Sequence, residues 1–176
     1  TDGLKIYTTI DSRMQRYAEE AVHEHIATKK TGLQDRFFKA KGKKKTAPFT
    51  DKLTVEEVNA IMDKAMRLTD RYRLMKKAGA SETEIRKAFN TPQEMTVFTY
   101  QGEKDTIMTP MDSLKYYKHF LRTCFMSMDP ITGYVKAYVG GTNYNYFQYD
   151  MANVGRRQVG STIKPYVYTL AMENGF

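Results

Sequence analysis

The sequence predicts an α+β fold, mainly helical over residues 1–122, with an antiparallel hairpin and a further helix over residues 123–176. Three observations support this division. In the first region apolar residues recur at helical spacing behind capping residues. Two short β-prone runs joined by a tight turn follow. Last comes an apolar stretch that begins near Pro165 and reaches Gly175.

The composition is that of a globular protein. The chain has 176 residues, of which 41% are hydrophobic and 27% charged, so it is long enough to bury a core and is not typical of a disordered chain. No run of 18 apolar residues predicts a membrane-spanning helix, and no signal peptide is recognisable. We expect the sequence to be a piece of a longer protein.

The first elements are predicted from local patterns. Lys5–Thr9 alternates polar and apolar residues and predicts a short strand. Ser12 and Gln15 have capping-box spacing and predict a helix start. One apolar face follows from Met14, Tyr17, Ala18, Ala21, Val22 and Ile26.

A basic loop is expected from Thr28 to Asp51. Five lysines between Lys39 and Lys45 supply five of the eight net positive charges. Such a run could bind nucleic acid, anionic lipid or an acidic wall polymer, but a solvated loop is the preferred interpretation. We expect the apolar exceptions in this loop to anchor it to the body; they are Phe37, Phe38 and Phe49.

The next segment alternates helices with one strand pair. Capping boxes at Thr54 and Ser81 predict a helix running to Lys77 and a shorter one to Phe89. Further predictions are a strand over Met95–Tyr100, a return strand through Met108, and a helix from Thr109–Pro110 to about Leu121.

The second region begins near Arg122 with the predicted hairpin. Phe125–Met128 and Tyr134–Val139 are the strands, and Asp129–Gly133 fits a type I turn with a bulge. Cys124 is expected to be buried and inert. His23 and His25 are two residues apart, so they point to different faces of a helix, and no metal site is expected.

Ser161 and Lys164 are the candidate catalytic residues. Being three apart, they leave the same side of an α or 3₁₀ turn. A serine needs a base to remove its proton, and a lysine partly removed from water can be that base. Pro165 lacks the N–H that would bond to the carbonyl of Ser161, which favours a tight turn ahead of the helix. Gly160 leaves room for a substrate.

A Ser-x-x-Lys pattern alone is weak, but its context resembles a known family. Cys124–Gly141, followed by Arg157–Pro165, resembles the start of the transpeptidase domain of class A penicillin-binding proteins. Gly3–Asp11 is similar to the segment after the glycosyltransferase domain of those two-function enzymes. Residues 1–122 would then be an inter-domain region with a helical insertion, and residues 123–176 the first part of a transpeptidase domain.

The resemblance implies a chemistry. Ser161 would attack the D-Ala-D-Ala carbonyl of a peptidoglycan stem peptide, Lys164 would accept its proton, and the backbone at Gly160 and Ser161 would supply part of an oxyanion hole. β-Lactams would acylate the same serine. No cofactor or metal is implied. Stem peptides and cell-wall synthesis proteins are the implied partners, with no nucleic acid. The parent would lie outside the cytoplasmic membrane, anchored by a preceding segment.

Two departures from the family pattern are visible. Val159 stands where the family usually has proline, with little functional effect expected. The family also uses a Ser-x-Asn and a Lys-Thr-Gly segment downstream of the serine, and neither follows Ser161. We therefore expect this chain to be inactive by itself. Two alternatives stay open: another Ser-x-x-Lys enzyme, such as a D,D-carboxypeptidase or β-lactamase, and an interaction module over residues 28–122.

Overall fold

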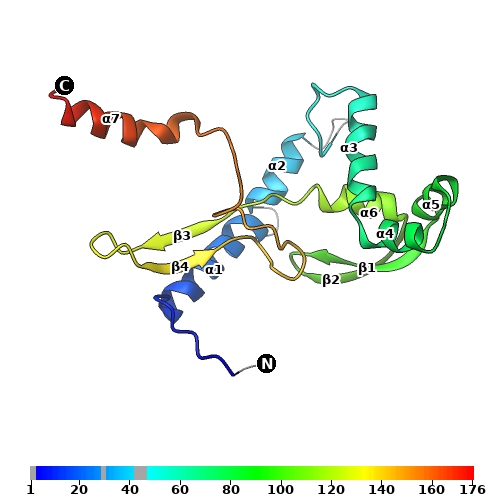
Figure 1. Ribbon diagram of the computed structural model, residues 1–176, viewed down its shortest axis with the longest axis horizontal. Coiled ribbons are helices and arrows are strands. Elements are labelled where there is room, and N and C mark those ends of the chain that lie inside the picture. Colours follow the sequence, from blue (N-terminus) through cyan, green and yellow to red (C-terminus); the bar gives the residue numbers. More distant parts are fainter. Residues whose placement is uncertain (1–2, 29–30, 42–46) are drawn as a thin grey trace.

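The computed structural model describes residues 3–28, 31–41 and 47–176. It is an α+β arrangement of two groups of elements and one outlying helix (Figure 1). One group is a hairpin with a helix against it; the other, called the insert below, covers residues 54–121. None of the helices in the described ranges is long and apolar enough to cross a membrane.

The hairpin packs on the first helix. Strands β3 (Phe125–Met128) and β4 (Val135–Val139) are antiparallel, with a register shift after Ser127 that confirms the predicted bulge. Gly133 has a φ of 72°, as the turn requires. On helix α1 (Ser12–Ala27), Ala18 and Val22 pack against the β4 side chains Ala137 and Val139.

The start of α1 differs from the prediction. Asp11, not Ser12, is the N-cap, and its carboxylate accepts the N–H groups of Arg13 and Met14. Gln15 is used elsewhere: its side-chain amide accepts the N–H of Tyr138 at 2.7 Å and donates to the Tyr138 carbonyl at 2.9 Å. The predicted capping box is therefore wrong by one residue, because a tertiary contact claims Gln15.

The strand predicted over Lys5–Thr9 is also wrong. Residues 3–10 are exposed and form no regular structure. Only the end of this segment touches the sheet, where the hydroxyl of Thr9 donates to the Val135 carbonyl and the N–H of Asp11 to the Lys136 carbonyl. Without a full partner strand, alternation alone does not make a ladder.

Part of the predicted basic loop is helical. Helix α2 (Leu33–Lys41) contacts α1, so the prediction of a continuous loop over Thr28–Asp51 is wrong. Phe37 and Phe38 meet edge to face, and Phe49 shares a cavity of about 70 Å³ with them. Most of the lysine run, residues 43–45, lies outside the described residues.

The insert contains six elements. They are α3 (Val55–Arg67), α4 (Asp70–Lys77), α5 (Glu82–Phe89), β1 (Gln93–Thr99), β2 (Gly102–Met108) and α6 (Pro110–Tyr117). The capping boxes at Thr54 and Ser81 are both present. The helix predicted to run to Lys77 instead breaks at Leu68, because Thr69 caps a second helix through its hydroxyl. The last helix ends at Tyr117, short of Leu121.

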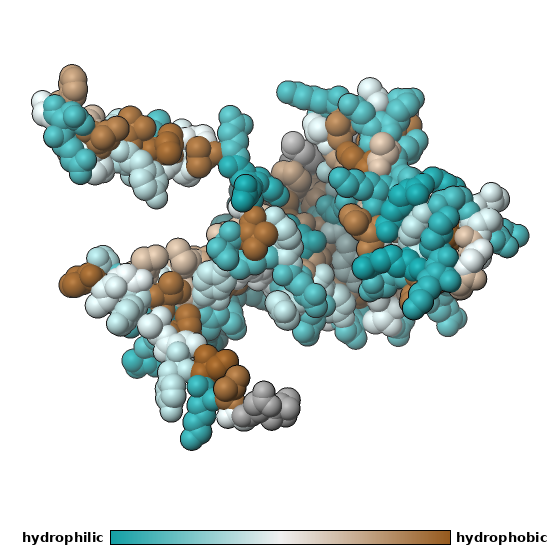
Figure 2. All heavy atoms as spheres, viewed as in Figure 1, coloured by the Kyte–Doolittle hydropathy of each residue, from teal (hydrophilic) through white to brown (hydrophobic). Residues whose placement is uncertain are grey.

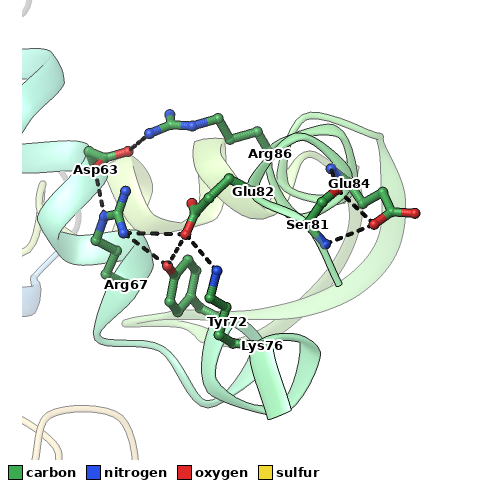
Figure 3. Close-up of polar contacts among 8 residues, drawn as sticks. All are labelled: Asp63, Arg67, Tyr72, Lys76, Ser81, Glu82, Glu84 and Arg86. Carbon is green, nitrogen blue, oxygen red and sulfur yellow. Dashed lines mark hydrogen bonds and ion pairs between the residues drawn. The ribbon is translucent and has the colours of Figure 1, made fainter. Parts of the chain in front are cut away.

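The insert has its own core and its own polar network. Helices α3 to α5 bury Met66, Tyr72, Ile85 and Phe89 together. Beside that core, Figure 3 shows Glu82 accepting from the Tyr72 hydroxyl at 2.6 Å and from Lys76 at 3.2 Å, while Asp63 pairs with Arg67 and Arg86. This region is therefore stabilised by contacts between its own elements.

Cys124 does not lie where the sequence predicts. It directly precedes β3 and is exposed. The strand that follows presents Phe125, Met126 and Met128 to solvent as well, each close to half exposed. The prediction that Cys124 is buried is therefore wrong, because the described residues cover only the face of the hairpin against α1.

Candidate active site

Ser161 and Lys164 lie in a tight turn at the start of the last helix. Gly160–Ile163 form the 3₁₀ helix η1, and α7 (Lys164–Glu173) continues from it. The N–H of Lys164 donates to the carbonyl of Ser161, which closes the turn, and Pro165 stands in the first turn of α7. The predicted tight turn is confirmed. Because residues three apart eclipse in a 3₁₀ helix, the two side chains leave the same side of the backbone.

Gly160 is required by the backbone. Its φ is +54°, a conformation that costs a residue with a Cβ about 1–2 kcal/mol. A Cβ built on Gly160 would meet no atom within 4 Å, so the surroundings do not crowd it. That Gly160 leaves room for a substrate, and that it takes part in an oxyanion hole, stay predictions.

The surroundings of the pair differ from the expectation. Ser161 and Lys164 are both exposed, and no hydrogen bond joins their side chains. The expected removal of Lys164 from water is therefore not provided by the described residues. Helix α7 is exposed on every face, including Tyr166, Leu170 and Met172, and stands away from the body with apolar atoms uncovered (Figures 1 and 2).

A helix that is apolar all round is normally enclosed by other elements. Within the described residues, α7 buries no side chain, and its close packing with another element is with the preceding turn η1. Two cavities lie elsewhere: one of about 660 Å³ between α1, α2 and the start of β3, and one of about 630 Å³ between α1 and the loop after β4. Neither is lined by Ser161 or Lys164. The turn that carries the pair is thus formed, but the described residues do not enclose the two side chains.

The loop that leads from β4 toward the turn is well ordered by contacts that the sequence analysis missed. Asp150 accepts the hydroxyl of Tyr138 at 2.6 Å, which lowers the pKa of the carboxyl and raises the pKa of the phenol to about 12. The N–H of Met151 returns to the carbonyl of Gly140 at 2.8 Å. In the sequence, these contacts are indicated only by the Gly140-Gly141 pair and the Tyr-rich loop that follows it.

The described residues form neither a metal site nor the family's Lys-Thr-Gly strand. Within residues 3–28, 31–41 and 47–176, no three His, Cys, Asp or Glu side chains gather as metal ligands would. The chain contains a Lys-Thr-Gly tripeptide at residues 30–32, which the sequence analysis overlooked. It precedes Ser161, and its Thr31 and Gly32 lie in the turn before α2 rather than in a strand, so it does not match the family's segment.

Comparisons with known proteins agree on one family. The model of the family described as "Penicillin-binding protein middle domain" matches residues 44–121. Penicillin-binding protein 1A of Neisseria flavescens is 25% identical over 99% of this chain. Over shorter stretches, penicillin-binding protein 1A of Escherichia coli is 42% identical (31% of the chain, 6% of the relative), and penicillin-binding protein 2D of Bacillus subtilis is 44% identical (30% and 8%). No solved structure matches significantly.

The chain spans about a quarter of the length of relatives that it matches throughout: 24% of the Neisseria protein and 23% of penicillin-binding protein 1A from Aquifex aeolicus, to which it is 28% identical. The middle-domain match covers the insert, and the full-length matches also cover both ends of the chain, where the sequence pattern resembles the same family. Over nearly its whole length, this chain is therefore similar to penicillin-binding protein 1A of several bacteria.

Proposed function

We propose that this chain is part of a peptidoglycan D,D-transpeptidase that uses Ser161 as its nucleophile and Lys164 as its base. The observation that carries the proposal is the 3₁₀ turn that presents both residues on one side at the amino end of α7. The amino end of a helix favours the negative charge that develops on an attacked carbonyl oxygen. The match to penicillin-binding proteins supports the same chemistry.

The reaction is an acyl transfer. Ser161 Oγ attacks the carbonyl carbon of the D-Ala-D-Ala bond while its proton passes to Lys164 Nζ. The tetrahedral intermediate collapses, the C–N bond breaks, and the leaving D-alanine nitrogen takes a proton. An amine of a second stem peptide then attacks the ester, and Ser161 Oγ regains a proton. The N–H of Ser161, in the first helical turn, has no partner within η1 and is free to face the oxyanion.

The environment of Lys164 decides whether the pair is active. Lys164 can accept a proton only when neutral, and removal from water is what favours a neutral lysine. In this structure Lys164 is exposed, and α7 buries no side chain. We propose that the rest of the full protein covers α7 and supplies the other residues that line the substrate site. The 176-residue chain alone should then bind no substrate productively.

Location and partners follow from the same proposal. Peptidoglycan stem peptides lie outside the cytoplasmic membrane, so the parent protein would work there, anchored by a segment that precedes this chain. Its ligands would be D-Ala-D-Ala peptides and β-lactams, and its partners other cell-wall synthesis proteins. Protease digestion of spheroplasts tests this placement: the parent protein should be degraded from outside, and full protection would contradict it.

Labelling of the full-length protein with a fluorescent penicillin tests the chemistry. One label per molecule is expected, none in Ser161→Ala, and labelling slowed at least about 100-fold in Lys164→Ala, the scale of a general base. Lys77→Ala, a matched exposed lysine, should label normally. Persistent labelling of Ser161→Ala would overturn the proposal. Stoichiometric labelling of the 176-residue chain would show that the site needs no residues from the rest of the protein.

An interaction module over residues 28–122 is a second candidate, favoured by the separate core of the insert. Complementation of a strain lacking the full-length gene distinguishes the two. If Ser161 carries the function, Ser161→Ala should fail to complement although it is expressed. Growth restored by Ser161→Ala would favour the interaction module.

A further inference from the structure

The loop over residues 140–155 is held by both parts of the molecule. It leaves β4, crosses to the insert, returns to the hairpin and then leads through residues 156–159 to Gly160 (Figure 1). These four linking residues carry no regular structure. The position of this loop therefore determines where the segment that leads to the Ser161 turn begins.

On the insert side, the loop is fixed by aromatic packing. Phe147 is 4% exposed, and its ring centroid lies 5.4 Å from that of Phe98 and 5.5 Å from that of Phe120. The guanidinium carbon of Arg122 lies 3.8 Å from the centroid of Phe147. Buried aromatic pairs at these distances add about 0.5–1.5 kcal/mol each beyond the area that they bury, so the contact is strong for a loop.

Tyr146 adds a polar contact beside Phe147. Its hydroxyl donates to the carboxylate of Glu103 on β2, and its ring centroid lies 4.8 Å from that of Phe98. The hydrogen bond to Glu103 raises the pKa of Tyr146 to about 12, so the phenol stays protonated as a donor at neutral pH. The loop is thus tied to the insert by both packing and hydrogen bonding.

On the hairpin side, the loop is fixed with little slack. Besides Tyr138, Asp150 accepts the N–H of Ala152 at 2.8 Å. A Cβ on Gly140 would come within 2.9 Å of Asp150 Oδ1, and a Cβ on Gly141 within 3.3 Å of the carbonyl of Phe147. The Gly-Gly pair therefore permits a close approach that larger residues would prevent.

We propose that this contact between the insert and the loop positions the Ser161 turn for acylation. The contact is called the aromatic joint, and its members are Phe98, Glu103, Phe120, Arg122, Tyr146 and Phe147. Its residues act through the loop and do not touch substrate. The inference rests on the proposed function and extends it. It assigns the insert a role in acylation at a site that the insert does not line.

The length of the linking segment makes such positioning effective. An extended residue spans at most about 3.6 Å, so residues 156–159 reach no further than about 14 Å. The position of the loop therefore limits where the Ser161 turn can lie. Misplacement of about 1 Å by a distant substitution can slow a reaction by about 100-fold. We expect a partial loosening of the joint to slow acylation about tenfold.

Acylation kinetics of the full-length protein with a fluorescent penicillin test the joint. Phe147→Leu loosens the packing, Glu103→Gln weakens the hydrogen bond to Tyr146, and Tyr144→Phe, in the same loop but 76% exposed, is the matched control. We expect Phe147→Leu and Glu103→Gln to lower the second-order rate constant of acylation while the final labelled fraction stays at one per molecule. Tyr144→Phe should keep the wild-type rate.

The possible results separate three explanations. A lower rate constant at full labelling, with faster amide exchange over residues 156–163, supports the joint. Wild-type rate constants in both joint variants would overturn it, as would a loss of labelled fraction in proportion to unfolded protein. If Phe147→Leu does not fold, Glu103→Gln decides alone. A wild-type protein that never labels at Ser161 would instead refute the proposed function, before any joint variant is compared.

Discussion

The insert and helix α7 are stabilised in opposite ways. The insert buries Ile85 and Phe89 to 1% exposure or less, caps its helices with side chains, and joins α3, α4 and α5 through one polar network. Helix α7, which carries Lys164, buries no side chain, has no side-chain cap and packs closely on η1 alone among the described elements. Helix α7 therefore has regular secondary structure although none of its side chains is buried.

This difference separates two roles. A region that satisfies its own side chains can serve as a fixed support for what it touches. A short, exposed, apolar helix is marginal by itself in water, so α7 depends on other parts of the full protein for its environment. The candidate catalytic residues thus lie on the least supported element, next to a loop that the best supported region holds.

The largest expected difference between the two regions is in the unfolding free energy lost when a large apolar side chain is removed. Phe89→Ala in the insert is expected to cost about 3–5 kcal/mol of unfolding free energy, because a buried ring is lost and a cavity left. Leu170→Ala in α7 should change it by less than about 0.5 kcal/mol. Urea unfolding of the 176-residue chain followed by circular dichroism measures both. Equal costs would mean that α7 packs on the body in solution.

Loss of a cap within the insert should have a smaller effect. The hydroxyl of Thr69 accepts the N–H of Tyr72 and starts α4, so Thr69→Ala should cost about 1 kcal/mol. Ser12→Ala, at a predicted cap that the structure does not use, should stay within about 0.5 kcal/mol. The same urea curves measure this pair. A larger cost for Ser12→Ala would restore the sequence-based capping box at α1.

The polar network predicts the smallest effect, and it depends on pH. Hydrogen bonds from Tyr72 and Lys76 lower the pKa of Glu82 below 4.5 in the folded chain. A lowered pKa contributes stability above the unfolded pKa, and this contribution is lost as the pH falls through the folded value. The melting temperature of Glu82→Gln should therefore lie below that of wild type at pH 7, and the difference should shrink below about pH 4.5.

Measurement of both proteins from pH 7 to pH 3 checks this prediction. Tyr72→Phe is the matched control, because it removes the strongest donor to Glu82 while leaving the carboxylate in place. It should narrow the pH dependence without abolishing it. A Glu82→Gln difference that grows toward low pH would contradict the assigned direction of the pKa shift.

Local patterns predicted the elements whose signals are local. The capping boxes at Thr54 and Ser81 and the turn at Asp129–Gly133 lie within a few residues of chain, and all three are confirmed. The 3₁₀ turn at Ser161 belongs to the same group, because Gly160 and Pro165 determine its backbone.

The misses have tertiary causes. The local pattern assigns Gln15 to a helix cap, but its actual partner, the backbone of Tyr138, lies 123 residues away in the sequence. Cys124 was expected to be buried because its surroundings are apolar in sequence, whereas burial depends on what covers the strand. The aromatic joint left only a Tyr- and Phe-rich composition in the sequence. No local rule states that Phe147 reaches Phe98.

The central claim is that Ser161, in the turn before α7, forms the acyl-enzyme. Mass spectrometry of the full-length protein after incubation with benzylpenicillin tests it most directly, because it locates the adduct on the chain. The account predicts a single penicilloyl group on the peptide that begins at Gln158, attached to Ser161. An adduct on any other residue, with Ser161 unmodified, would contradict it.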